Sequence, residues 1–268
     1  SSETPFRSGY VAIVGRPNVG KSTLINRLVG QDLCIVSPRP QTTWHRILGI
    51  KNLPGAQILF LDTPGIHQSN ALFNQNLFRA AERALADADV IVWVIDATEA
   101  EHPDDALILE TIRQQKPNTP VLLVPNKVDR ISKPLLLPLI ARWQAVYGFA
   151  EIIPISALKG DNILGPSEAT PWYKGPALLP YLETVELDEA RMQRGPFRMP
   201  VQDVYKFTAF GDARRIVAGR VSSGSLRLGD TVVFYPSGKR SLVKTIEAFN
   251  AASPAEAVSG QSTGFTLE

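Results

Sequence analysis

The strongest constraint on the fold lies near the N-terminus, where a glycine-bearing loop joins an apolar run to a helical segment. Residues 10–14 are apolar and end at Gly15, as expected of a buried parallel strand. The loop at 15–22 fits the pattern G-x-x-x-x-G-K-[ST], and the segment 21–30 carries apolar residues at helical spacing. This order predicts a phosphate-binding loop, because glycines let backbone N–H groups wrap phosphates and the helix N-terminus adds a positive dipole end.

The residue types in this loop suit a nucleotide with a bound metal ion. We expect Lys21 to reach the β- and γ-phosphates and the Ser22 hydroxyl to bind Mg²⁺. The other residues expected to contact the nucleotide here are Asn18, Val19, Gly20 and Thr23.

Strands and helices alternate through the first part of the chain. Short apolar runs at 58–61, 90–95, 121–124 and 152–155 predict buried strands. Between them, 73–86, 103–115 and 135–147 have helical patterns. This alternation predicts a doubly wound α/β domain with a mainly parallel sheet.

A second motif, D-T-P-G at 62–65, follows the strand at 58–61. An aspartate at a strand end suits a metal role, so we expect Asp62 to act on Mg²⁺ through a bound water. We expect the N–H of Gly65 to meet the γ-phosphate.

The remaining two motifs predict recognition of guanine. A carboxylate that accepts two N–H groups from one base edge favours guanine over adenine, and Asp129 in N-K-V-D can do this. We expect Asn126 to tie this segment to the phosphate loop and Lys127 to lie along the base. Ser156, Ala157 and Leu158 follow the next strand, and the Ala157 N–H can meet guanine O6. All four motifs follow predicted strands, which is the edge where open α/β sheets bind ligands.

The pattern changes after residue 160. Residues 161–195 are rich in glycine and proline, with one helix predicted at 178–185 and a linker at 186–195. Short strands separated by turn signals follow at 200–206, 215–222, 230–235, 241–248 and 261–267. We therefore expect a nucleotide-binding domain at 1–160, a helix and linker at 161–195, and a small all-β barrel at 196–268.

Residues 5–160 resemble the G domain of Era, within the TrmE–Era group of GTPases. The matching stretches are 5–10, 15–22, 41–43, residue 66 and 126–129. The resemblance implies a P-loop GTPase that uses GTP, GDP and Mg²⁺, with Thr43 as the switch threonine on Mg²⁺ and the γ-phosphate. It implies that Asn18 helps hold a potassium ion. Ile66 stands where Ras-like proteins have a water-orienting glutamine, so intrinsic hydrolysis should be slow.

Residues 156–268 are similar to the GTPase subunit of ATP sulfurylase, CysN or NodQ. The matching stretches are 156–162, 170–173, 178–183, 199–204, 218–221, 228–230 and 236–239. The region at 196–268 is also similar to the second domain of translation-factor GTPases. This resemblance implies a protein partner for the barrel and an alternative function, in which GTP hydrolysis drives sulfate activation on an ATP sulfurylase catalytic subunit.

Charge and composition set the remaining expectations. Residues 163–268 hold 12 Lys or Arg and 11 Asp or Glu, which is not the basic balance of a nucleic-acid footprint. Binding to RNA or the ribosome is therefore a weaker alternative. One cysteine suits a reducing cytosol, and neither a signal-like stretch nor an apolar run of 18 residues occurs, so we expect a cytoplasmic protein without a transmembrane segment.

Overall fold

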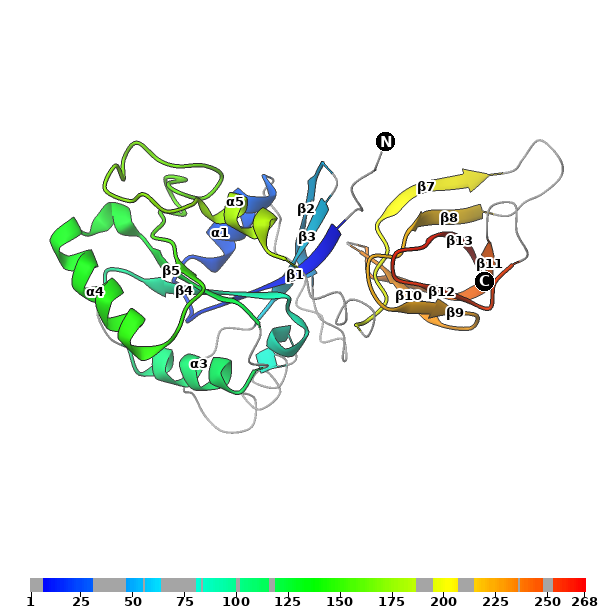
Figure 1. Cartoon of the computed structure of the whole chain (residues 1–268), viewed down its shortest axis with the longest axis horizontal. Helices are drawn as coiled ribbons and strands as arrows, with labels where there is room; N and C mark the ends of the chain where they lie inside the picture. The colour runs from blue at the N-terminus through cyan, green and yellow to red at the C-terminus, as the bar shows by residue number, and fades with distance from the viewer. Residues whose placement is uncertain are drawn as a thin grey trace. The chain divides into compact units, whose positions relative to one another are not determined.

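The computed structural model describes most of the chain, which falls into two compact units (Figure 1). One, here the α/β unit, comprises Gly9–Lys51 and Ile58–Val185. The other, the β unit, comprises Ser1–Ser8, Asn52–Gln57 and Glu186–Glu268. The described residues are 7–30, 47–54, 56–63, 81–82, 84–99, 102–115, 119–186, 195–206, 215–235, 237–247 and 253–268.

A six-stranded sheet with the order β2-β3-β1-β4-β5-β6 forms the centre of the α/β unit. The three pairs β1–β4, β4–β5 and β5–β6 are parallel. Every residue of β4 and β5 is buried, as expected of strands covered on both faces. The strands are β1 (Arg7–Val14), β2 (Ile47–Leu53), β3 (Ala56–Asp62), β4 (Val90–Asp96), β5 (Val121–Asn126) and β6 (Glu151–Ile152).

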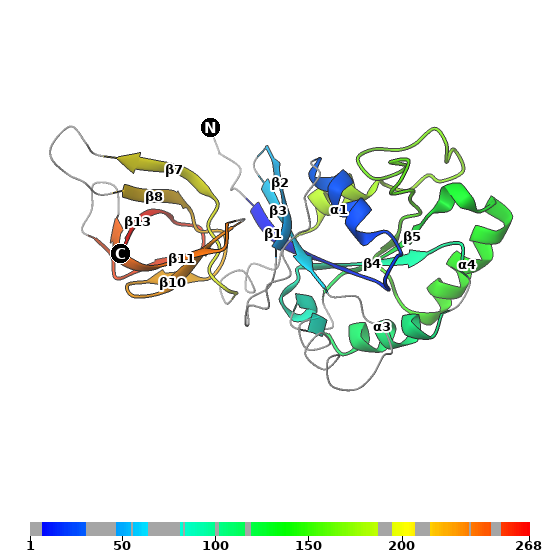
Figure 2. The same cartoon turned by 180° about the vertical axis from the view of Figure 1, so that it is seen from behind.

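Helices cover both faces of this sheet. Figures 1 and 2 place α3 and α4 on one side and α1 and α5 on the other. The α3–α4 side packs around Trp93, whose ring meets Trp143 edge to face at 4.8 Å. The helices are α1 (Lys21–Val29), α3 (Pro103–Arg113), α4 (Lys133–Val146) and α5 (Leu178–Thr184), with a short 3₁₀ turn η1 (Val128–Arg130). Among the residues described, no helix has the length and apolar character needed to cross a membrane.

The expected doubly wound α/β domain is confirmed, and two of its strands differ from the prediction. β2 was not predicted, because Lys51 and Asn52 interrupt any apolar run. β6 ends at Ile152, whereas a strand was expected at 152–155. Trp172 packs against the α3–α4 side of the α/β core, and the Lys133 ammonium lies 5.9 Å from its ring centroid.

The β unit is built from antiparallel strands, as expected of an all-β domain. A five-stranded sheet has the order β10-β11-β13-β8-β7, and β12 pairs with β9 in a separate ribbon. Its core centres on Phe265, with Phe197 and Phe234 each 6.5 Å away between ring centroids. The strands are β7 (Val201–Lys206), β8 (Arg215–Arg220), β9 (Ser225–Arg227), β10 (Thr231–Phe234), β11 (Lys239–Glu247), β12 (Glu256–Val258) and β13 (Ser262–Leu267).

Candidate nucleotide-binding site

The glycine-bearing loop connects β1 to α1, as the sequence predicts. Gly20 precedes the first residue of α1 with a φ of 100°, in the left-handed region. A Cβ atom on Gly20 would lie 2.3 Å from the Asn126 amide nitrogen, and one on Gly15 would lie 2.4 Å from the Val94 carbonyl oxygen. Both glycines therefore let the loop lie directly against neighbouring parts of the fold.

Lys21 bends back over this loop. Its ammonium donates to the carbonyl oxygens of Gly15 and Arg16, both at 2.6 Å. The charge is thereby held beside the loop backbone, where a phosphate would be expected. A bound phosphate would have to share the ammonium with these carbonyl groups or displace them.

Asn126 joins the phosphate loop to the expected base motifs. Its side chain is buried and its amide nitrogen donates to the Val19 carbonyl oxygen at 2.7 Å. Its amide oxygen accepts the Ala157 N–H at 2.8 Å. The Ala157 N–H, expected to meet guanine O6, thus donates within the protein in this structure.

The segment at 156–158 is also held from α1. Arg27 donates to the carbonyl oxygen of Ala157 at 3.3 Å and to that of Leu158 at 2.6 Å. Ser156 is buried, whereas the Leu158 side chain is exposed. Arg27 was not singled out from the sequence, because an arginine on a helix surface 130 residues from its partner carries no local signal.

Lys127 and Asp129 lie where β5 passes into η1. Lys127 has a φ of 67°, a left-handed backbone that is uncommon for a lysine. Its ammonium contacts the Asp96 carboxylate at 2.5 Å, at the end of the neighbouring strand β4. Asp129 is exposed, so its carboxylate is open to a ligand.

Asp96 is a buried acid that no motif in the sequence marks. Burial by itself would raise its pKa, but hydrogen bonds from Lys127 and Thr98 outweigh burial and hold the pKa below the ordinary 3.8. Thr98 supplies both its N–H, at 3.0 Å, and its hydroxyl, at 2.6 Å. The carboxylate is therefore ionised at neutral pH and fixed on both oxygens.

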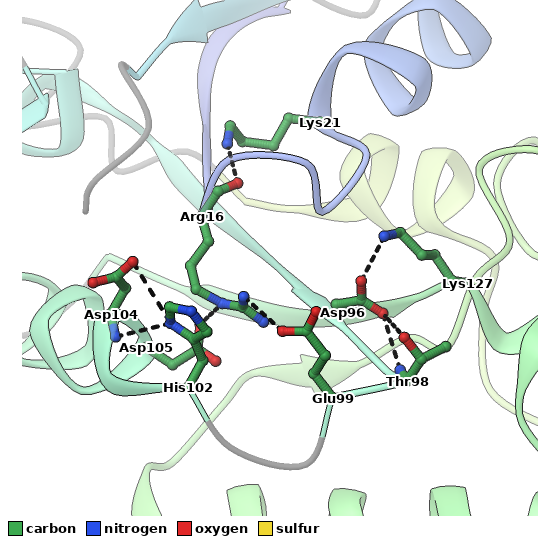
Figure 3. A network of polar contacts seen from close by, with 9 residues as sticks. All are labelled: Arg16, Lys21, Asp96, Thr98, Glu99, His102, Asp104, Asp105 and Lys127. Atoms are coloured by element: carbon green, nitrogen blue, oxygen red, sulfur yellow. Dashed lines mark hydrogen bonds and ion pairs between the residues drawn. The ribbon is translucent and has the colours of Figure 1, made fainter. Parts of the chain in front are cut away.

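Arg16 makes a second buried ion-pair cluster behind the loop (Figure 3). Its Nε donates to Asp105 at 2.9 Å and its Nη1 to Glu99 at 2.9 Å. Burial disfavours the guanidinium charge, but the two carboxylates outweigh burial and raise the Arg16 pKa. Burial also raises the pKa of Asp105, and the Arg16 charge opposes that shift.

The expected metal-binding groups are described in part. Ser22 is exposed in the first turn of α1, and Asp62 is the last residue of β3. Thr43 and Gly65 lie outside the described residues, as do Ile66 and most of the expected helix at 73–86. Asn18, with a φ of 64°, and Thr23 are exposed at the loop and helix start. Among the described residues, no group of three or more His, Cys, Asp or Glu could hold a metal.

Comparison with known proteins agrees with this geometry. Residues 10–127 match the family described as 50S ribosome-binding GTPase. The chain is 46% identical over 162 residues to GTPase Era of Geotalea uraniireducens, covering 60% of this chain and 54% of the relative. It is 45% identical over 158 residues to GTPase Era of Syntrophus aciditrophicus, covering 59% and 51%. The chain thus spans about half the length of the curated relatives it matches.

Solved structures resemble the chain in two ways. Era in complex with MgGDPNP and a segment of 16S ribosomal RNA is 47% identical, with a TM-score of 0.51, covering 59% of this chain and 53% of that one. The elongation factor SelB of Methanococcus maripaludis, in complex with a GTP analogue, is 22% identical to this chain, with a TM-score of 0.56. The match covers 99% of this chain and 52% of SelB. At this identity the match shows a shared fold alone. The first part of the chain is therefore similar to Era, and the chain as a whole shares its fold with the elongation factor SelB.

Proposed function

We propose that the chain binds GTP and GDP through its α/β unit and hydrolyses GTP to GDP and phosphate as a molecular switch. One observation supports this most directly: the buried Asn126 side chain bonds both the phosphate loop, at Val19, and the expected base segment, at Ala157. A single side chain thereby sets the spacing between a phosphate site and a base site, which a nucleotide would span. The identity to Era G domains agrees with this reading.

Within this proposal, the described residues divide the work between phosphates, metal and base. Lys21 places a positive charge beside the phosphates, and backbone N–H groups of 18–23 surround them. Mg²⁺, bound by the nucleotide and Ser22 with Asp62 acting through water, would neutralise phosphate charge. Asp129 would accept two N–H groups of guanine, and Lys127 would support the base.

The rate of hydrolysis depends on residues around the γ-phosphate. We infer that Thr43 and Gly65 contact this phosphate, and that Ile66 leaves the attacking water without a side chain to orient it. Slow turnover is therefore expected from the chain alone. A potassium ion beside Asn18 would add positive charge to the β–γ region and speed the reaction.

The experiment is a nucleotide titration followed by turnover. GDP binding is measured for the wild type, for Lys21→Ala and for Lys239→Ala, a control in β11 of the β unit. We expect Lys21→Ala to lose tight binding and Lys239→Ala to bind as the wild type does. Wild-type protein that binds no GDP, or a Lys21→Ala variant that binds normally, contradicts the proposed site.

Two further measurements refine the proposal. Asp129→Asn should shift preference from guanosine to xanthosine nucleotides, because the amide replaces one acceptor by a donor. Unchanged guanine preference would contradict the role of Asp129.

GTP turnover should be faster in potassium than in sodium buffer if Asn18 supports a cation. Equal turnover in the two buffers would contradict the potassium site.

Association with ribosomal RNA is a second candidate function. A solved Era structure that covers 59% of this chain contains a segment of 16S ribosomal RNA, although this chain covers 53% of that protein. If the chain shares this property, RNA affinity should fall steeply with salt. A protein partner for the β unit, and a role in sulfate activation, stay predictions that rest on the sequence resemblance.

A further inference from the structure

The connection between β4 and α3 lies beside both parts of the proposed nucleotide site. It begins at Asp96, the last residue of β4, and reaches Asp105 in the first turn of α3. Its described residues are 96–99 and 102–105. Figure 3 shows that two of its carboxylates point toward Arg16 and a third toward Lys127.

The first contact of this connection is with Lys127, in the N-K-V-D segment that is expected to bind the base. In the parallel β4–β5 register, Asp96 lies opposite Asn126, which places it next to Lys127. The Lys127 ammonium bonds one carboxylate oxygen of Asp96, while Thr98 bonds the other. Lys127 has a strained left-handed backbone. The ion pair therefore holds the ammonium end of a residue whose backbone has this unfavourable conformation.

The second contact is with the phosphate loop. Arg16 directs its guanidinium into the fold, onto Asp105 and Glu99, while its carbonyl oxygen accepts from Lys21. Arg16 and Asp105 are both buried, and Glu99 is half exposed. The guanidinium is thus an anchor for the loop backbone rather than a group that faces the phosphates.

We propose that the β4–α3 connection positions both halves of the nucleotide site, with Asp96 acting through Lys127 on the base half and Asp105 acting through Arg16 on the phosphate half. This inference rests on the proposed nucleotide-binding function. In this role neither carboxylate needs to touch the nucleotide, because each already bonds a protein cation. Both are positioning residues, and each acts through one identified cation.

The base half is tested by a double-mutant cycle on GDP affinity. Asp96→Asn keeps an oxygen for Thr98 but places an amide where the Lys127 ammonium needs an acceptor. Losing this charge-assisted bond should raise the Kd for GDP about 10-fold. In a Lys127→Met background the same change should have little further effect, because the residue through which Asp96 acts has been removed. Additive losses in the cycle would overturn this role.

The phosphate half is tested by comparing GDP with GMP, which lacks the β-phosphate. Asp105→Asn should raise the Kd for GDP about 10-fold, by the same loss of a charge-assisted bond, and that for GMP far less. Asp96→Asn should weaken both ligands by a similar factor, since they share the base. An equal loss of GDP and GMP binding in Asp105→Asn would overturn the assignment to the phosphate half.

Controls separate positioning from loss of folding. Glu110→Gln removes an exposed carboxylate further along α3, whose Arg113 contact is 3.9 Å long, and should leave both Kd values unchanged. Circular dichroism melting without nucleotide checks that each variant folds. If Asp96→Asn does not fold, Asp96→Glu keeps the charge but displaces it. Its GDP binding should still be weaker than that of the wild type, and wild-type affinity would overturn the proposal.

The inference and the proposed function fail in different ways. A wild-type chain that binds no GDP removes the proposed function. A wild type that binds GDP tightly, with Asp96→Asn and Asp105→Asn equal to it, leaves that function standing and removes the positioning role of the connection.

Discussion

The Asn126 amide nitrogen donates to the Val19 carbonyl oxygen at 2.7 Å, although 107 positions separate the two residues. Val19 lies in the phosphate loop and Asn126 is the last residue of β5. The bond therefore links the loop that follows β1 to the end of β5, although β4 lies between these two strands in the sheet. The conformation of the phosphate loop therefore depends on the position of Asn126 at the end of β5.

Replacing Asn126 by aspartate tests this link. An aspartate cannot donate to Val19, and it would place an oxygen against the carbonyl oxygen. We expect the free energy of unfolding to fall by about 1–3 kcal/mol, the cost of an unsatisfied buried group, and GDP binding to weaken. Urea denaturation and a GDP titration measure the two effects.

An exposed amide provides the matched control. Asn52 accepts a hydrogen bond from Gln57 through its side-chain oxygen, which Asn52→Asp retains. This variant should match the wild type in stability and GDP affinity. The role of Asn126 is contradicted if Asn126→Asp behaves in the same way as the control.

The same contact limits residue 20 to glycine. A Cβ atom there would lie 2.3 Å from the Asn126 amide nitrogen, at a φ of 100°. Gly20→Ala should therefore lose GDP binding, because either the loop or Asn126 must move and the left-handed backbone itself costs about 1–2 kcal/mol. Isothermal titration with GDP measures the loss. Gly148→Ala, where no atom lies within 4 Å of the added Cβ, should bind GDP as the wild type does.

Much of this site could be predicted from local sequence. The rest of the site is set by the topology of the sheet and could not be predicted in this way. The strand, loop and helix around Lys21 were predictable, because glycines and apolar residues mark them within 20 residues. Asp96 follows an apolar strand, so its place at the edge of the sheet could also have been predicted. Its bond to Lys127 could not, because that pairing requires β4 and β5 to be neighbours in register.

The ion pair of Arg16 with Asp105 is another contact that local sequence cannot predict. The two residues are 89 positions apart, and charged residues are usually solvated on the surface. No local pattern distinguishes this buried arginine from an exposed one. Likewise, β2 carries lysine and asparagine and becomes a strand through its pairing in the sheet beside β3.

Acid stability provides a test of Asp96. Its pKa lies below the ordinary 3.8 in the folded chain, so the Asp96–Lys127 pair adds stability above that pH. This contribution is lost as pH falls from 3.8 through the folded-state pKa. Asp96→Asn should therefore be less stable than the wild type at pH 7, and the difference should shrink on acidification toward pH values below the folded-state pKa. Urea denaturation from neutral to acid pH measures it, and a constant difference at every pH would contradict the pairing.

The β unit offers a change whose effects should stay within it. Gly219 lies in β8, where it pairs with Thr263 of β13 and Val201 of β7. A Cβ atom there would lie 2.2 Å from the Pro200 carbonyl oxygen, so Gly219→Ala must displace backbone. We expect overpacking to destabilise this unit by about 1–3 kcal/mol and to speed hydrogen exchange at β7 and β8 amides. Gly229→Ala, which meets no atom within 4 Å but keeps a φ of 81°, separates the cost of backbone conformation from that of contact. Both variants should bind GDP as tightly as the wild type, because the proposed nucleotide site lies wholly in the α/β unit. Weaker GDP binding by Gly219→Ala would show that the site depends on the β unit.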